Sequence, residues 1–180
     1  SFISLFLGML MANDRNGAFL TRLFTTPLKG ADYIFGYSLP MIPIAVVQSL
    51  CCFVTALFFG FTLSYKILLA LLVLLPSAGL FISFGLLLGS VFSASQVGGV
   101  SSILINVAAW LSGTWFNLDL IGGAFTKICN LLPFVHTIDS VAAVFNGDYA
   151  AIPFHLAWVL GYSAIVCFFA IRLFRKRMME

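Results

Sequence analysis

The sequence contains few side chains that could do acid, base or metal chemistry. Only 8% of its 180 residues are charged, and two are histidines. His136 and Asp139 are three residues apart, so on a helix they would share one face, and His155 begins a later apolar run. A metal site takes three or four ligands, and the spacing leaves the proximity of these three side chains open. We therefore predict no metal site, and favour solvated or helix-capping roles over a proton relay.

Motifs of other chemistries are not found in the sequence. No spacing suggests a Ser-His-Asp arrangement or a pair of catalytic carboxylates. No GxxxxGK[ST] loop occurs, so this chain cannot bind ATP by that route. The cysteines form no CxxC pair, which favours small apolar side chains in helices over disulfides or zinc ligands. We predict that the chain is not an enzyme and binds no cofactor itself.

The elements that must position these residues are membrane spans. Hydrophobic residues make up 62% of the chain, whereas soluble domains carry about 45–50% apolar residues and about 25% charged ones. The net charge of +3 is too small and too dispersed to suggest nucleic acid as a partner. Only helices or closed barrels cross lipid, and long unbroken apolar runs are typical of helices.

Four apolar runs are long enough to cross a hydrocarbon core, which takes about 20 helical residues. These runs are 36–62, 67–92, 98–116 and 150–171. Residues 1–12 are too few to span, and we interpret them as the end of a span that begins before this sequence. The predicted fold class is an all-α polytopic membrane protein, in which residues 1–180 form a single transmembrane domain with four full spans and one partial span.

Basic residues gather on one side of these predicted spans. Seven of the nine lysines and arginines lie in segment 13–35 or in the tail 172–180. Four crossings place both segments on the same side, and the positive-inside rule makes that side cytoplasmic. We predict a multi-pass protein of the cell membrane with both segments in the cytoplasm.

Residues 117–149 do not fit a further crossing. They contain two short apolar stretches separated by Pro133, and a fifth span would place the basic tail outside. We predict an outer re-entrant hairpin of two short helices that carries Pro133, His136 and Asp139, because surrounding protein can satisfy its broken backbone. An amphipathic loop at the membrane interface is the alternative.

Polar residues inside the predicted spans are rare. Gln48 and Asn106 lie near the middle of theirs, where an unpaired amide is costly. Hydrogen bonding between helices is the favoured interpretation, and a position facing the transport pathway is the alternative. No span has a charged residue at its middle, which argues against a proton or sodium antiporter. Gly85 and Gly89 form a GxxxG pattern that would permit close helix approach.

A short amphipathic helix is predicted within residues 14–27. Its apolar side chains would share one face: Phe19, Leu20, Leu23 and Phe24. Arg15 and Arg22 would lie on the opposite side, and Pro27 would end the helix. From periodicity alone the helix either rests on lipid headgroups or presents a surface to a cytoplasmic partner.

The same segment resembles the cytoplasmic signature of exporters of the ATP-binding-cassette (ABC) type-2 permease family. That signature has an acidic residue, an Arg, a Gly, a Leu-rich turn and Thr-Pro, and the matching positions are Asp14, Arg15, Gly17, Leu20, Leu23, Thr26 and Pro27. A later stretch resembles the family's region before its final span through Ser112, Gly113, Phe116 and Pro133. The resemblance covers nearly the whole chain but lacks the family's first span. The family often has a basic residue where this chain has Tyr37.

The resemblance implies a transmembrane exporter subunit that forms a dimer with a second copy or a paralogue. Separate ABC ATPase subunits would bind ATP and magnesium, and the chain would contact them through a coupling helix formed by residues 14–27. The coupling residues would be Asp14, Arg15, Gly17, Phe19, Leu20, Arg22, Leu23, Phe24, Thr26 and Pro27. Residues 117–149 would be the outer element that closes the pathway.

The predicted cargo is a hydrophobic or amphipathic molecule, such as a drug, a lipid or a lipid-linked glycan, because the spans offer an apolar pathway. Two other functions stay open. A membrane scaffold or anchor would dock another protein without transport or ATPase stimulation. An ATP-independent channel or secondary transporter would show flux without nucleotide.

Overall fold

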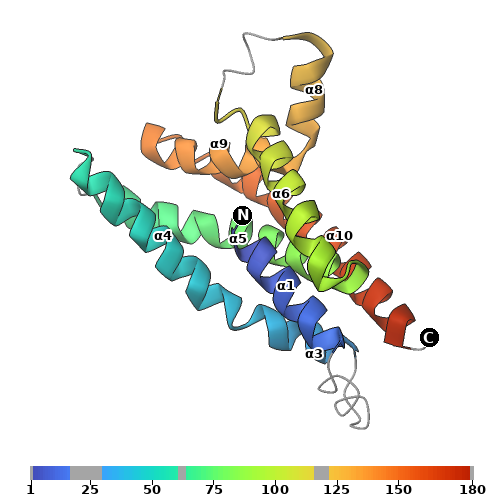
Figure 1. The fold of residues 1–180 in the computed structure, drawn as a ribbon. Coiled ribbons are helices and arrows are strands. Elements are labelled where there is room, and N and C mark those ends of the chain that lie inside the picture. Colours follow the sequence, from blue (N-terminus) through green and yellow to red (C-terminus); the bar gives the residue numbers. More distant parts are fainter. Residues whose placement is uncertain (1, 17–29, 61–63, 116–121, 179–180) are drawn as a thin grey trace.

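The computed structural model describes residues 2–16, 30–60, 64–115 and 122–178, and the elements in these ranges are helices (Figure 1). In chain order they are α1 (Phe2–Asn16), α3 (Gly30–Ser38), α4 (Met41–Phe58), α5 (Lys66–Val91), α6 (Ala94–Leu111), α8 (Gly123–Leu131), α9 (Pro133–Asn146) and α10 (Ile152–Met178). Within the described residues, four stretches are long and apolar enough to cross a membrane: Asp32–Phe58, Lys66–Val91, Ala94–Leu111 and Ile152–Phe174. The predicted all-α polytopic fold is confirmed.

The observed helices follow the predicted apolar runs, but their first and last residues differ from the predicted bounds. The first run is built from α3 and α4, separated by a turn at Leu39 and Pro40. Pro40 has no backbone N–H to donate and directly precedes α4. At the two ends of the chain, α1 continues to Asn16 and α10 to Met178, so helix extends beyond the apolar runs into the basic segments.

The central helix is α5, which contacts α1, α3, α4, α6, α9 and α10. Its backbone comes very close to α1 at Gly85 and Gly89. A Cβ added to Gly85 would lie 2.8 Å from the carbonyl oxygen of Ser4, and one added to Gly89 would lie 2.9 Å from that of Gly8. Any side chain at these positions would force the two helices apart. The predicted role of this glycine pair in close helix approach is confirmed.

Two clusters of buried apolar side chains hold the neighbours of α5 in place. The first joins α1, α3, α4, α5 and α10 through Ile3, Leu7, Met11, Tyr33, Ile34, Met41, Ala45, Ile82, Leu86, Ala170 and Phe174. The second joins α5, α9 and α10 through Ala70, Val73, Ala143, Val144 and Ile152. Many large apolar side chains elsewhere are exposed, such as Phe58, Phe59 and Phe154, as expected of a surface that faces lipid.

Residues 117–149 contain the bent helix pair α8–α9. The two helices meet at 80°, and Pro133 is the first residue of α9. Proline suits this position because the first helical N–H has no partner within the helix. By length and composition the pair is either one broken span or a re-entrant loop. The break lies where the sequence predicted it, and insertion from the outer side stays a prediction.

Replacing Gly89 with alanine should separate α1 from α5. The new Cβ would lie 2.9 Å from both the Gly8 carbonyl oxygen and the Met11 Cβ, and overpacking of this kind costs about 1–3 kcal/mol. We expect a lower midpoint of thermal unfolding in detergent, measured by circular dichroism. Gly161→Ala on α10 is the matched control, because its Cβ would meet nothing within 4 Å. Equal midpoints for the two variants would contradict the close approach of α1 and α5.

Candidate functional site

Arg15 lies on the last turn of α1 and caps the C-terminal end of α5. Its guanidinium donates to the carbonyl oxygen of Ser90 at 2.5 Å and to that of Phe92 at 2.9 Å. Carbonyl groups at a helix C-terminus lack partners within the helix and carry partial negative charge, so a cation stabilises them. The contact fastens the end of α1 to the end of α5.

Asp14, the neighbour of Arg15, connects α1 to a different helix, α3. Its carboxylate accepts a hydrogen bond of 2.7 Å from the hydroxyl of Tyr37 on α3. Asp14 therefore connects α1 to α3, and Arg15 connects α1 to the end of α5. The sequence predicts that both side chains begin a separate coupling helix, whereas the structure places them on α1. The other predicted coupling residues lie outside the described ones: Gly17, Phe19, Leu20, Arg22, Leu23, Phe24, Thr26 and Pro27.

A cavity of about 570 Å³ lies mainly between α4, α5 and α9. Its apolar lining consists of Ile3, Ala45, Cys52, Phe53, Leu74, Ala78, Phe81, Ile138, Val141, Ala142 and Phe145. Its polar lining consists of Gln48, Ser49, Ser77 and Thr137. The Ser77 hydroxyl is buried and has no hydrogen-bond partner within the described part of the chain. A cavity of this size and composition suits a largely apolar ligand with a few hydrogen-bonding groups.

The two intramembrane amides have different surroundings. Gln48 lies on the cavity wall, and a position facing a transport pathway stays a prediction. Asn106 is exposed on α6 and is not among the lining residues. Its side-chain amide donates to the carbonyl oxygen of Ser102 at 2.8 Å, one turn earlier on the same helix.

The outer-hairpin residues meet the start of α10. His136 on α9 is only 5% exposed, and its Nδ1 lies 2.8 Å from the Nδ1 of His155. Its other ring nitrogen, Nε2, lies 3.0 Å from the carbonyl oxygen of Asn130. Asp139 joins them, and the ligand atoms of the three residues all lie within 4.8 Å of one another. The spacing predicted that His136 and Asp139 share a face but not that His155 would join them.

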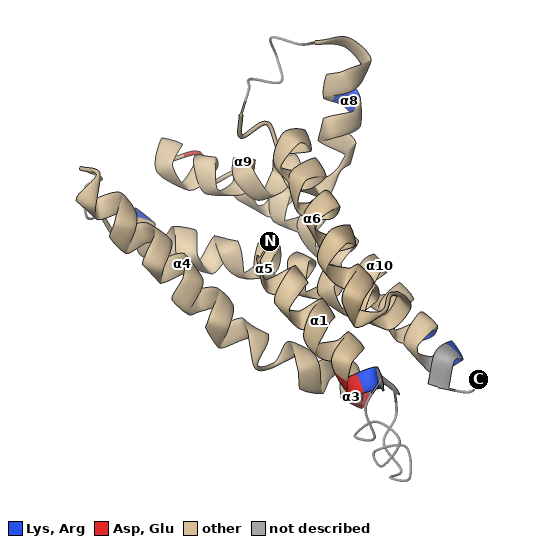
Figure 2. Cartoon of the chain, viewed as in Figure 1, with Lys and Arg blue, Asp and Glu red and all other residues tan. Residues whose placement is uncertain are grey.

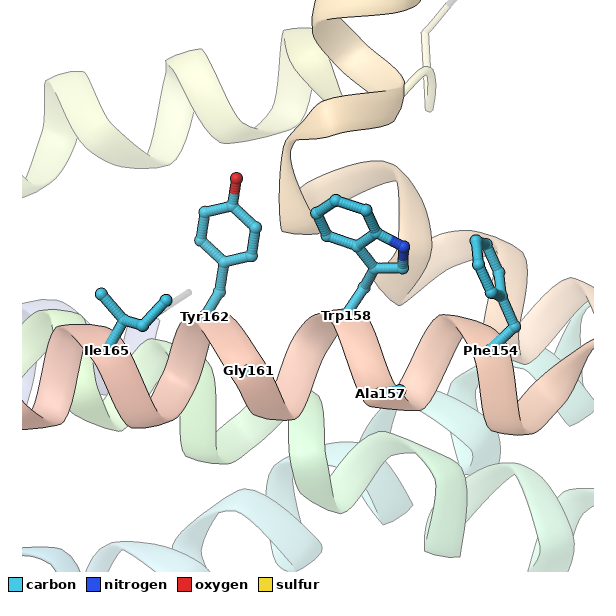
Figure 3. A pocket seen from close by; sticks show the side chains of 6 residues that line it. All are labelled: Phe154, Ala157, Trp158, Gly161, Tyr162 and Ile165. Carbon is cyan, nitrogen blue, oxygen red and sulfur yellow. The ribbon is translucent and has the colours of Figure 1, made fainter.

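Sequence reasoning missed a row of aromatic side chains on α10, which Figure 3 shows. The row flanks the histidines. Phe154, Trp158 and Tyr162 recur every four residues and line a pocket on one face of α10. Trp158 stacks on both Tyr162 and His136, with ring centroids 5.9 and 5.3 Å apart. The Tyr162 hydroxyl also donates to the carbonyl oxygen of Leu131, the last residue of α8. The regular spacing of aromatic residues was the available sequence signal.

Contacts at the N-terminal end of α5 hold the C-terminal end of α9 in place. The Lys66 ammonium donates to the carbonyl oxygen of Phe145 at 2.6 Å, in the last turn of α9. The hydroxyls of Tyr65 and Tyr149 are 3.3 Å apart. This hydrogen bond raises the pKa of Tyr149 above its ordinary value. Lys66 thus stabilises the end of α9 as Arg15 stabilises the end of α5.

The sequence of this helical chain matches the model of a known protein family. The family model described as "ABC-2 type transporter" matches residues 1–146, which include α1 through α9. The chain belongs to the ABC-2 type transporter family. It is therefore a membrane permease component of an ABC transporter, in a family that associates with ABC ATPase subunits and whose membrane domains are normally not catalytic. No match was found among curated proteins or among solved structures.

Replacing Arg15 with glutamine should loosen the junction of α1 and α5 in this ABC-2 permease. Hydrogen bonds from charged groups contribute about 1.5–3 kcal/mol, and a neutral, shorter side chain would lose them. We expect Arg15→Gln to unfold at a lower temperature than the unaltered chain in detergent. Lys176→Gln, which removes an exposed charge on α10, is the control and should leave the unfolding temperature unchanged. The cap would be refuted by equal unfolding temperatures for the two variants.

Proposed function

We propose that this chain forms the translocation pathway of an ATP-driven exporter for hydrophobic or amphipathic molecules. The observation that carries the proposal is the cavity between α4, α5 and α9 in a chain of this family. Of the described residues that line it, none is charged. A drug, a lipid or a lipid-linked glycan combines an apolar body with a few polar groups, as this lining does.

The energy for export would come from separate ABC ATPase subunits that bind ATP and magnesium. Residues 14–27 would seat against such a subunit, with Phe19, Leu23 and Phe24 in an apolar groove and Arg22 paired with acidic residues. The contacts of Asp14 and Arg15 support this role. Because they fasten the neighbouring helices to one another, a displacement of the coupling segment would reach α3 and α5 directly.

The orientation that we propose places the coupling segment and the C-terminal tail in the cytoplasm. Figure 2 shows basic residues at the end of α1 and near the end of α10, and others at the start of α5 and on α8. Four further basic residues lie next to these two groups in the sequence: Arg22, Lys29, Arg175 and Arg177. The larger group would face the cytoplasm by the positive-inside rule. The α8–α9 pair would then lie on the outer side and close the pathway there as a re-entrant element.

A second permease subunit, either another copy or a paralogue, would complete the pathway. Few spans enclose little space, and most of the surface of α4 that does not face the cavity is exposed and apolar. The dimer would enclose cargo that one chain covers on one side only.

Replacing Phe24 with aspartate should uncouple transport from ATP hydrolysis, because a charge cannot enter an apolar groove without a large desolvation penalty. Membrane insertion of the variant should stay intact. We expect an ABC ATPase to copurify with the tagged chain from its native membrane in mild detergent, and to be lost with Phe24→Asp. Phe24→Leu, which keeps an apolar side chain, is the matched control and should retain the ATPase. If no ATPase appears even after cross-linking, the scaffold or channel functions replace this proposal, and normal export by Phe24→Asp would refute the coupling role.

Two adjacent cysteines test whether the cavity is a water-accessible pathway. Both cysteines are exposed, but Cys52 lines the cavity and Cys51 does not, because successive residues on a helix point about 100° apart. A charged methanethiosulfonate reagent reacts with thiolates in water. We expect it to modify a variant that keeps only Cys52 faster than one that keeps only Cys51. Equal rates in membrane vesicles would argue against the pathway.

A further inference from the structure

We propose that His136, Asp139 and His155 bind a divalent transition-metal ion, with Zn²⁺ as the ion that best fits the ligands. The three side chains come from two helices, α9 and α10, that meet at the turn after Asn146. The proposal rests on their geometry and surroundings, and it holds whether or not the chain is an exporter.

The ring of His136 is oriented as a metal ligand. The carbonyl oxygen of Asn130, 3.0 Å from Nε2, can only accept a hydrogen bond, so Nε2 carries the proton. In the neutral imidazole the lone pair is then on Nδ1, which faces His155. Histidines that bind metals commonly donate their second N–H to a carbonyl in this way, which fixes both tautomer and ring orientation.

The distances suit one shared ion after small side-chain adjustments. Zinc lies about 2.0–2.2 Å from nitrogen and oxygen ligands, which places tetrahedral ligands about 3.3–3.6 Å apart. The two Nδ1 atoms, 2.8 Å apart, would separate slightly. The carboxylate of Asp139, whose ligand atom lies within 4.8 Å of the others, would move inward. His136 and Asp139 are one helical turn apart, as in other helical metal sites where a His and a carboxylate are at i and i+3.

The ligand types select the ion. Imidazole suits zinc, copper and nickel, whereas magnesium and calcium prefer oxygen ligands alone. Two histidines and one carboxylate leave a fourth tetrahedral position that a water molecule would fill. A neutral His155 would move its proton from Nδ1 to Nε2, so binding releases no net proton from neutral rings.

The surroundings of the cluster strengthen this assignment. Trp158 stacks on His136 and Phe154 meets it edge-on, with ring centroids 5.3 and 5.8 Å away. Packing against these rings leaves His136 only 5% exposed and fixes the orientation of its imidazole. A bound ion would join α9 to α10 at the same junction where Tyr162 holds α8.

The test is a calorimetric titration of the metal-free, full-length chain with zinc chloride in detergent. Cys51 and Cys52 are replaced by serine, because adjacent thiols also bind zinc. We expect one zinc ion per chain, with affinity lowered at least tenfold by His155→Ala and by Asp139→Asn. Asp148→Asn is the matched control, since this exposed carboxylate follows α9 and is not part of the cluster. Equal affinities for all four proteins would overturn the proposal.

A cysteine in place of His155 gives a test that does not depend on losing the site. In a folded His155→Cys variant, bound Co²⁺ should show a thiolate-to-cobalt charge-transfer band in the near ultraviolet. The parent chain in the same Cys51 and Cys52 background should bind Co²⁺ without that band. If the folded variant shows no band, residue 155 is not a ligand, and the two histidines form only a hydrogen bond.

Discussion

The backbone contact between α1 and α5 is the constraint on which the other contacts depend. Gly85 and Gly89 leave no room for a side chain against Ser4 and Gly8, so the backbones of the two helices pack closely together. This approach brings the end of α1 to the end of α5, where the Arg15 guanidinium reaches two carbonyl oxygens. The remaining surface of α5 is then available to α4, α9 and α10, which define the cavity and the histidine cluster.

Cations from neighbouring helices cap two helix ends in succession. Arg15 of α1 caps α5, and Lys66, the first residue of α5, caps α9. The two contacts lie at opposite ends of α5 and form a continuous mechanical connection from α1 to α9. Under the proposed function, this connection runs from the segment beside the ATPase to the element on the outer side. Such a connection is a physical route for coupling between the two ends of α5.

Periodicity and length predicted the helices, whereas the partners of particular side chains depended on tertiary packing. The four candidate spans, the break at Pro133 and the close approach at the glycine pair followed from local patterns. Spacing placed His136 and Asp139 on one face, but only the fold of α9 against α10 brings His155 to them. In the same way, the resemblance marked Asp14 and Arg15 without indicating that both would be bonded within the chain.

The turn at Leu39 and Pro40 has a consequence for the size of the cavity. The buried residues of α4 are Met41 and Ala45, both near this turn, and the neighbouring α3 is held by Tyr37 and Tyr33. The 18 residues of α4 extend from there for about 27 Å along one cavity wall. A tilt of about 10° at the turn would carry the far end of α4 by about 5 Å, close to the pitch of one helical turn. The cavity would then widen as a wedge. Under the proposed function, the size of the largest cargo would depend on the angle at the Leu39–Pro40 turn rather than on the side chains along the cavity wall.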